Sequence, residues 1–169
     1  MVALDGWICR NYKNANRQIT RHLSVMNNNI KKFSIGIDPG RNTAIAVYNR
    51  NTGKIELLKT TDFWGAYDII LRDYLPDFVH KLVIERPSSN SVWHKMASRR
   101  GAIEKTAQNV GSVLREADLL IKRMRDLGYN VVVVDPLGKV NAERFRKITG
   151  YELRTNQHER DAGMMVFGC

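Results

Sequence analysis

The amino-acid sequence predicts an α/β fold with five strands and four helices around one core. Short apolar runs, rich in β-branched residues and bounded by turn residues, occur five times and predict the strands. Longer stretches between and after them carry apolar residues at the spacing of an amphipathic helix. A chain of 169 residues, 43% of them hydrophobic, fits one such domain better than two.

The first three expected strands follow one another closely. Residues 33–38 alternate apolar and small side chains and stop at a Pro-Gly pair, which is typical of a strand that runs into a tight turn. Residues 43–48 form the second strand, and an Asn-Thr-Gly turn separates it from the third, at 54–60. Because the connections are short, we expect an antiparallel meander.

The middle of the chain alternates helices with a strand. Apolar positions at helical spacing predict a helix at 65–75, and residues 81–85 are a short buried strand that ends in a carboxylate. A polar, basic loop over residues 86–100 leads to a long helix at 101–127, which Gly128 is placed to end. The apolar stripe of this helix consists of Ile103, Ala107, Val110, Leu114, Ala117, Ile121 and Met124.

Three elements complete the expected fold. Residues 130–134 predict a fifth strand, which ends at Asp135 and a proline. A basic helix follows at about 139–148 and is broken by Gly150. A last helix runs from about residue 156 to the end.

Charge indicates the class of partner. Lys and Arg number 27 against 17 Asp and Glu, a formal net charge of +10. This excess favours a polyanionic partner, nucleic acid first, although an incidental surplus of lysine gives the same number. No apolar run approaches the roughly 18 residues that a membrane helix needs, so we expect no membrane partner.

The N-terminal stretch and the thiols bear on localisation. Residues 1–32 are basic and rich in Asn, and we expect a flexible or accessory arm there, ahead of a folded domain at 33–169. The N-terminus lacks the pattern of a secretory signal, and Cys9 and Cys169 have no metal-ligand spacing. We therefore expect a reduced, intracellular protein of the cytoplasm or nucleoid, with an organelle transit peptide left open.

Four side chains that can bind a metal stand at strand ends or on one helix face. Asp38 ends the first strand and Glu85 the fourth, while His158 and Asp161 lie three residues apart on the last helix. Carboxylates gathered in one place repel one another unless a cation neutralises them, and such hard ligands suit Mg²⁺ or Mn²⁺. Two such ions can activate a water and stabilise the leaving oxygen of a phosphodiester.

Each of these residues also has a simpler interpretation. Taken alone, Asp38 before Pro-Gly is a turn former, and His158 with Asp161 fits an exposed helix face. Asp135, at the end of the fifth strand, either competes for the same site or is itself a turn residue. The joint pattern, on the right elements of a basic chain, is what favours a metal site.

Five segments of the chain together resemble RuvC-type Holliday junction resolvases. They cover about 33–168 and correspond to that family's first hairpin, second acidic strand, long helix, fifth strand with its lysine, and closing metal-ligand helix. The segments are 33–47 (FSIGIDPGRNTAIAV), 82–87 (LVIERP), Gly101 to Gly128, 131–139 (VVVVDPLGK), and Thr149-Gly150 with 156–162 (NQHERDA).

The resemblance implies a fold, a reaction and a set of residues. The fold is RNase H-like, with a five-stranded mixed sheet (an antiparallel meander, then parallel strands) flanked by helices. The reaction is symmetric nicking of four-way DNA junctions by a homodimer with two Mg²⁺ or Mn²⁺ ions per active site. Asp38, Glu85, His158 and Asp161 match the four catalytic, metal-binding positions, with His at the third as a variant known in the family.

The sequence departs from the family's pattern in three places. Residues 1–32 have no counterpart, the expected last helix is short after Asp161, and the loop at 86–100 lacks the aromatic-and-Asn sequence of bacterial members. Such departures suit a phage or organelle version of such an enzyme.

Basic and aromatic residues around the expected site would contact DNA. Lys139 matches the family's lysine and can approach the scissile phosphate as a point charge, or it is a surface lysine that opens a helix. Trp93 stands among cations in the loop and can stack on opened bases or be a buried anchor. The expected DNA-binding residues are Trp93, Lys95, Arg99, Arg100, Arg144 and Lys147.

Three functions stay open on the sequence. The first is a structure-selective endonuclease that resolves four-way junctions. The second is a non-catalytic junction or nucleic-acid-binding protein with the same fold, which the intact set of four ligand residues disfavours. The third is an RNase H-like nuclease that acts on other branched DNA or on RNA, and the family resemblance alone favours junctions over it.

Overall fold

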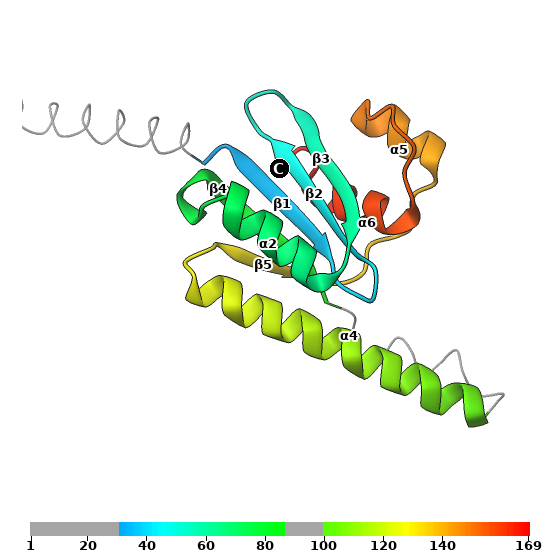
Figure 1. Ribbon diagram of the computed structural model, residues 1–169. Helices are drawn as coiled ribbons and strands as arrows, with labels where there is room; N and C mark the ends of the chain where they lie inside the picture. The colour runs from blue at the N-terminus through cyan, green and yellow to red at the C-terminus, as the bar shows by residue number, and fades with distance from the viewer. Residues whose placement is uncertain (1–30, 87–99) are drawn as a thin grey trace, which may run out of the picture. The chain divides into compact units, whose positions relative to one another are not determined.

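One mixed sheet carries the fold (Figure 1). The computed structural model describes residues 31–86 and 100–169, and for residues 100–110 the backbone alone. The sheet consists of β1 (Phe33–Asp38), β2 (Thr43–Asn49), β3 (Lys54–Thr61), β4 (Val79–Glu85) and β5 (Val131–Val134). The helices are α2 (Phe63–Asp73), the 3₁₀ helix η1 (Pro76–Phe78), α4 (Arg100–Asp126), α5 (Ala142–Thr149) and α6 (Gln157–Val166).

The sheet has the topology that the sequence predicts. Its strand order is β3-β2-β1-β4-β5. The pairs β1–β2 and β2–β3 are antiparallel, whereas β4 pairs in parallel with both β1 and β5. The predicted α/β fold, with an antiparallel meander followed by parallel strands and flanked by helices, is confirmed. Among the helices that the structure describes, none is long and apolar enough to cross a membrane.

Polar caps set the helix boundaries that the apolar pattern placed only roughly. The side chain of Asp62 accepts a hydrogen bond from the Gly65 amide, so α2 begins at Phe63. The side chain of Asn141 does the same for Arg144, and α5 therefore begins at Ala142, three residues later than expected. Gly150 ends α5 in the left-handed conformation, with φ of 68°, as its position predicted.

The larger hydrophobic core lies between the sheet and helices α2 and α4. Alternate residues of the strands point to this face and pack against the apolar stripes of both helices. On α4, Ala117, Ile121 and Met124 are buried as predicted, and Leu114 is half-buried. The buried residues of this core are Ile35, Ile37, Ile45, Val47, Ile70, Val79, Leu82, Ile84, Leu120, Ile121, Met124 and Tyr129. The side chains of Ile103, Ala107 and Val110 lie outside the described residues.

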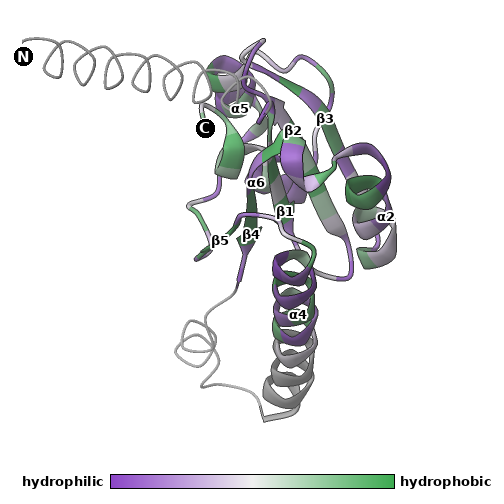
Figure 2. Cartoon of the chain, turned by 90° about the vertical axis from the view of Figure 1, so that its left-hand side faces the viewer, coloured by the Kyte–Doolittle hydropathy of each residue, from purple (hydrophilic) through white to green (hydrophobic). Residues whose placement is uncertain are grey.

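A second core lies on the opposite face of the sheet, under α5 and α6. Figure 2 shows the sheet on edge, with α2 and α4 on one side and α5 and α6 on the other. Small side chains dominate the strand residues that point here, so α6 lies close to the sheet. The buried residues of this core are Ala44, Ala46, Tyr48, Ile55, Val83, Phe145, Ala162, Met165 and Val166.

Helix α6 lies very close to the sheet at Gly36. A Cβ at this position would overlap the carbonyl oxygen of Ala162 and lie 3.2 Å from Cγ1 of Val166. Because the first of these atoms belongs to helix backbone, the helix would have to move away to make room. The glycine in the middle of β1 therefore decides how near α6 comes to the end of that strand.

We predict that Gly36→Ala destabilises the fold by about 2 kcal/mol, because the methyl group overpacks the β1–α6 contact. Urea unfolding measures the change. Gly111→Ala on α4 is the matched control, since its Cβ would meet no atom within 4 Å; alanine there should stabilise the helix by up to about 1 kcal/mol. Equal effects of the two substitutions would contradict the close approach.

Candidate metal centre

Two parallel strands bring Asp38 and Glu85 to one edge of the sheet. Ile37 of β1 is in register with Ile84 of β4, so the two acids that follow them end neighbouring strands side by side. Strand alternation turns both acids to the face that α6 covers, because the isoleucines before them point into the opposite core. The side chain of Asp38 is 12% exposed, and Glu85 is half-buried.

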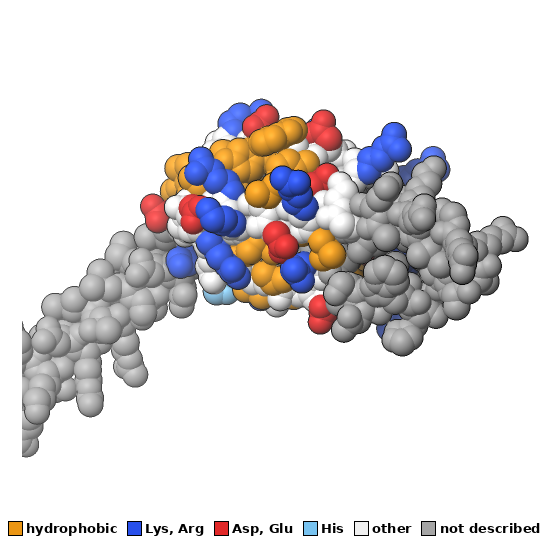
Figure 3. Space-filling model, turned by 90° about the horizontal axis from the view of Figure 1, so that it is seen from below, with side chains coloured by type: hydrophobic (Ala, Val, Ile, Leu, Met, Phe, Trp, Pro, Cys, Tyr) orange, Lys and Arg blue, Asp and Glu red, His pale blue; other side chains and the backbone are white. Residues whose placement is uncertain are grey.

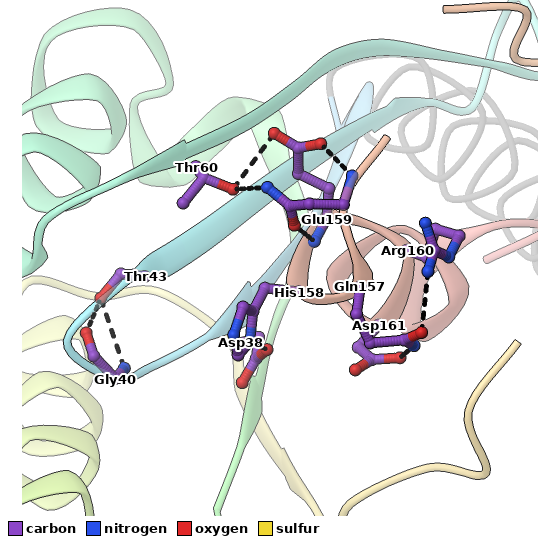
Figure 4. A network of polar contacts seen from close by, with 10 residues as sticks. Asp38, Gly40, Thr43, Thr60, Gln157, His158, Glu159, Arg160 and Asp161 are labelled. Carbon is purple, nitrogen blue, oxygen red and sulfur yellow. Dashed lines mark hydrogen bonds and ion pairs between the residues drawn. The ribbon is translucent and has the colours of Figure 1, made fainter. Parts of the chain in front are cut away.

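Helix α6 adds His158 and Asp161 to this edge. Nδ1 of His158 lies 2.8 Å from Oδ2 of Asp38. Asp161 follows one turn later on the same helix face, and its carboxylate lies on the same side of α6 as Asp38 (Figure 4). The structure thus brings together an acid from β1, an acid from β4 and a histidine–aspartate pair from α6.

A capping box fixes where α6 begins, and this sets the position of His158 in its first turn. The side-chain oxygen of Asn156 accepts a hydrogen bond from the backbone N–H of Glu159, and the Glu159 carboxylate accepts one from the backbone N–H of Asn156. The hydroxyl of Thr60 on β3 contacts both side chains. It accepts a hydrogen bond from Nδ2 of Asn156 at 2.6 Å and donates one to Oε1 of Glu159 at 3.1 Å. The pattern Asn-x-x-Glu in the sequence is a recognisable signal for such a helix start, whereas the contact with Thr60 has none.

The acids disturb one another's ionisation. Burial, and after it the nearby charges of Asp38 and Asp161, together raise the pKa of Glu85 to about 7. Burial also raises the pKa of Asp38, although the hydrogen bond from His158 opposes that rise. Lys139 lowers the pKa of both carboxyl groups, so its ammonium lies close enough to be felt at the site. Elevated carboxyl pKa values in a shared site are typical of functional centres.

Asp135 ends β5 but does not join the other acids. Val134 is in register with Glu85 and lies on the α6 face, so the next residue turns the other way. Asp135 is exposed, and its charge is felt by Arg86, whose guanidinium binds Asp118 of α4 at 2.8 Å. The geometry therefore disfavours Asp135 as a ligand of this site.

The predicted DNA-binding residues fall in two groups. Arg144 and Lys147 are exposed on α5. Lys139 is also exposed, in the segment that joins β5 to α5. The predictions for Trp93, Lys95, Arg99 and the side chain of Arg100 lie outside the described residues.

The donor chemistry of the site fits a hard divalent cation. Three carboxylates and an imidazole converge, and the charges that raise the pKa of Glu85 are charges that a cation would neutralise. Asp38, Glu85, Asp161 and His158 would supply oxygen and nitrogen ligands of the kind that Mg²⁺ or Mn²⁺ takes. As the side chains stand, no three such groups in the described part of the chain lie close enough to share one ion. Binding therefore needs side-chain rotations at this edge.

Comparison with known proteins adds no family to these observations. No protein-family model and no curated protein matches the chain.

We predict that the metal-free protein loses stability as pH rises from about 5 to about 8. The ordinary pKa of Glu85 is 4.5 and the folded pKa is about 7; between them the folded state binds more protons than the unfolded chain, so the free energy of unfolding falls with rising pH. Asp38→Asn should lower the pKa of Glu85, yet leave it above 4.5 because burial, the larger cause, remains. Carboxyl ¹³C NMR titration measures both values.

Asp135→Asn is the control for that titration, because it removes a strand-end charge outside the site. It should leave the pKa of Glu85 unchanged. A wild-type Glu85 that titrates near 4.5 would contradict the shared, partly buried site.

Proposed function

We propose that this protein is a metal-dependent endonuclease of the RuvC type, which resolves four-way DNA junctions by symmetric nicking. The observation that carries the proposal is the convergence of Asp38, Glu85, His158 and Asp161 at one sheet edge. The place of each residue in the sequence predicts it as a metal ligand, and the three elements β1, β4 and α6 bring the four together. Carboxyl groups with raised pKa values that share a partly buried site favour a functional centre.

The chain's own residues would divide the chemistry as follows. Asp38, Glu85, His158 and Asp161 would hold two Mg²⁺ or Mn²⁺ ions. Bound there, the ions supply an activated water and neutralise charge that develops on the phosphodiester. Lys139, exposed and within electrostatic reach of the acids, would attract and orient the scissile phosphate. The buried Asp38 would be held in place by His158 before DNA arrives.

The described surface suits a polyanion. Figure 3, the view from below, shows Lys and Arg side chains spread among apolar ones, with fewer acids. On the part of α4 whose side chains are described, residues 111–126, the exposed cations are Arg115, Lys122, Arg123 and Arg125. Such a surface supports DNA as partner, in line with the net charge of +10. Junction selectivity and a homodimer are parts of the proposal that come from the family resemblance, because two linked sites are needed to nick two strands of one junction.

A cleavage assay on a labelled four-way junction, a linear duplex and an RNA–DNA hybrid tests the proposal. With Mg²⁺ or Mn²⁺ we expect paired nicks in the junction and none with EDTA. Asp38→Asn should reduce the rate to below about a hundredth, because it removes a metal ligand. The matched control, Asp135→Asn, removes a strand-end acid outside the site and should keep the wild-type rate.

The outcomes separate the three candidate functions. Binding of the junction without cleavage in any metal would favour a non-catalytic binding protein. Cleavage of the hybrid in preference to the junction would favour a nuclease for other substrates. Cleavage that survives Asp38→Asn would refute the metal site itself.

We further predict that His158→Asp keeps measurable cleavage and shifts the metal preference from Mn²⁺ toward Mg²⁺. An imidazole is the softer ligand and favours Mn²⁺, whereas a carboxylate favours Mg²⁺. The ratio of the rates in the two metals measures the shift, and Asp135→Asn again serves as control. An unchanged ratio would show that His158 is not a ligand.

A further inference from the structure

Arg160 lies between the two metal-binding residues of α6, yet its side chain reaches back to a different part of the chain. Its Nε donates to the carbonyl oxygen of Val140 at 2.8 Å. Its Nη1 donates to the carbonyl oxygen of Thr155, and its Nη2 to Oε1 of Gln157, each at 2.8 Å. The planar guanidinium thus joins the segment after β5 to the first turn of α6 through three nitrogen donors.

Gln157 passes this restraint on to the site. Its Nε2 donates to Oδ1 of Asp161 at 2.6 Å, while its own oxygen is held by Arg160 (Figure 4). With both ends of the amide engaged, the side chain cannot flip without losing one of the two bonds. One oxygen of the Asp161 carboxylate is therefore oriented, and the structure shows no partner for the other oxygen among the described residues.

The same guanidinium restrains Lys139. Its hydrogen bond to Val140 holds the backbone one residue beyond this lysine, whose charge is felt at both Asp38 and Glu85. In the part of the chain that the structure describes, Arg160 forms no ion pair within 4.0 Å, since all its contacts are to neutral oxygens. Arg160 thus acts by holding these groups in place, and its hydrogen bonds neutralise no acid of the site.

We propose that Arg160 is a positioning residue that couples the cationic segment at Lys139 to the acidic site, acting on Asp161 through Gln157. The inference rests on the proposed function, because it assigns Asp161 to a metal and Lys139 to a phosphate. Partners that orient a ligand are typically as necessary as the ligand itself, and their loss costs about 10- to 100-fold in metal affinity.

Two substitutions separate the path from Arg160 through Gln157 to Asp161 from the bond between Arg160 and Val140. Gln157→Leu removes the bond to Asp161 and keeps the bonds from Arg160 to Val140 and Thr155. It should weaken Mn²⁺ binding, measured by calorimetry without DNA, by about 10-fold and leave amide hydrogen exchange in residues 137–141 unchanged. Arg160→Gln should weaken Mn²⁺ binding by a similar factor and also speed exchange in 137–141, because it removes the bonds to both Gln157 and Val140.

Arg160→Lys and Arg154→Gln complete the series. A lysine keeps the charge but cannot span the three acceptors, so we expect it to restore neither Mn²⁺ affinity nor slow exchange in full. Arg154 is exposed in the segment that joins α5 to α6, and its side chain forms no hydrogen bond or ion pair among the described residues, so Arg154→Gln should match the wild type. Circular dichroism and thermal unfolding would check that each variant folds.

The outcomes distinguish this inference from the function on which it rests. If the wild type binds Mn²⁺ and cuts the junction, but Arg160→Gln binds Mn²⁺ as tightly as Arg154→Gln, the positioning role is wrong and the proposed function stands. Full rescue by Arg160→Lys would likewise reduce Arg160 to a charge and overturn the role. If the wild type neither binds Mn²⁺ nor cuts, the proposed function fails and the positioning role fails with it.

Discussion

The short distance between α6 and the sheet is the constraint on which the rest of the site depends. A helix packed at ordinary distance over larger strand residues would hold His158 too far from the strand end to contact Asp38 at 2.8 Å. Gly36 allows the carbonyl of Ala162 to approach the strand, and small residues on β2 continue the same shallow surface. Gly163 lets α5 pack closely on α6, because a Cβ there would lie 2.8 Å from the ring of Phe145.

The close packing of α6 gathers acidic side chains at one sheet edge, where they do not help the fold to form. Burial and the charge of Asp161 draw both Asp38 and Glu85 toward the neutral form, and the charge of Asp38 adds to the effect on Glu85. A site that only stabilised the fold would place apolar or paired residues there. His158 and Lys139 relieve part of the repulsion, and a divalent cation would relieve more. Binding of a cation would thus restore stability that is lost at this sheet edge, and would link folding to metal binding.

Local patterns were enough to predict most of the framework. The strand ends at Asp38 and Glu85, and the pairing of His158 with Asp161, follow from turn residues and helical spacing. The rejection of Asp135 needed more, because it depends on the register of β4 with β5, which tertiary packing sets. Arg160 was missed for a related reason. Its neighbours in the sequence mark it as one more cation of a helix face, and only the path of the segment after β5 brings the Val140 carbonyl within its reach.

The contact between His158 and Asp38 also limits how a metal could enter. Nδ1 is engaged by a carboxylate, and the structure shows no partner for Nε2 among the described residues. Metal-binding histidines commonly pair one ring nitrogen with a carboxylate and give the other to the ion. By that pattern Nε2 would be the ligand atom, and Asp38 would be its orienting partner through Oδ2. Because the side chain of His158 is 52% exposed and that of Asp38 only 12%, the imidazole can rotate with less rearrangement than the carboxylate. The histidine would therefore be the side chain that adjusts to an ion, around an aspartate that burial holds in place.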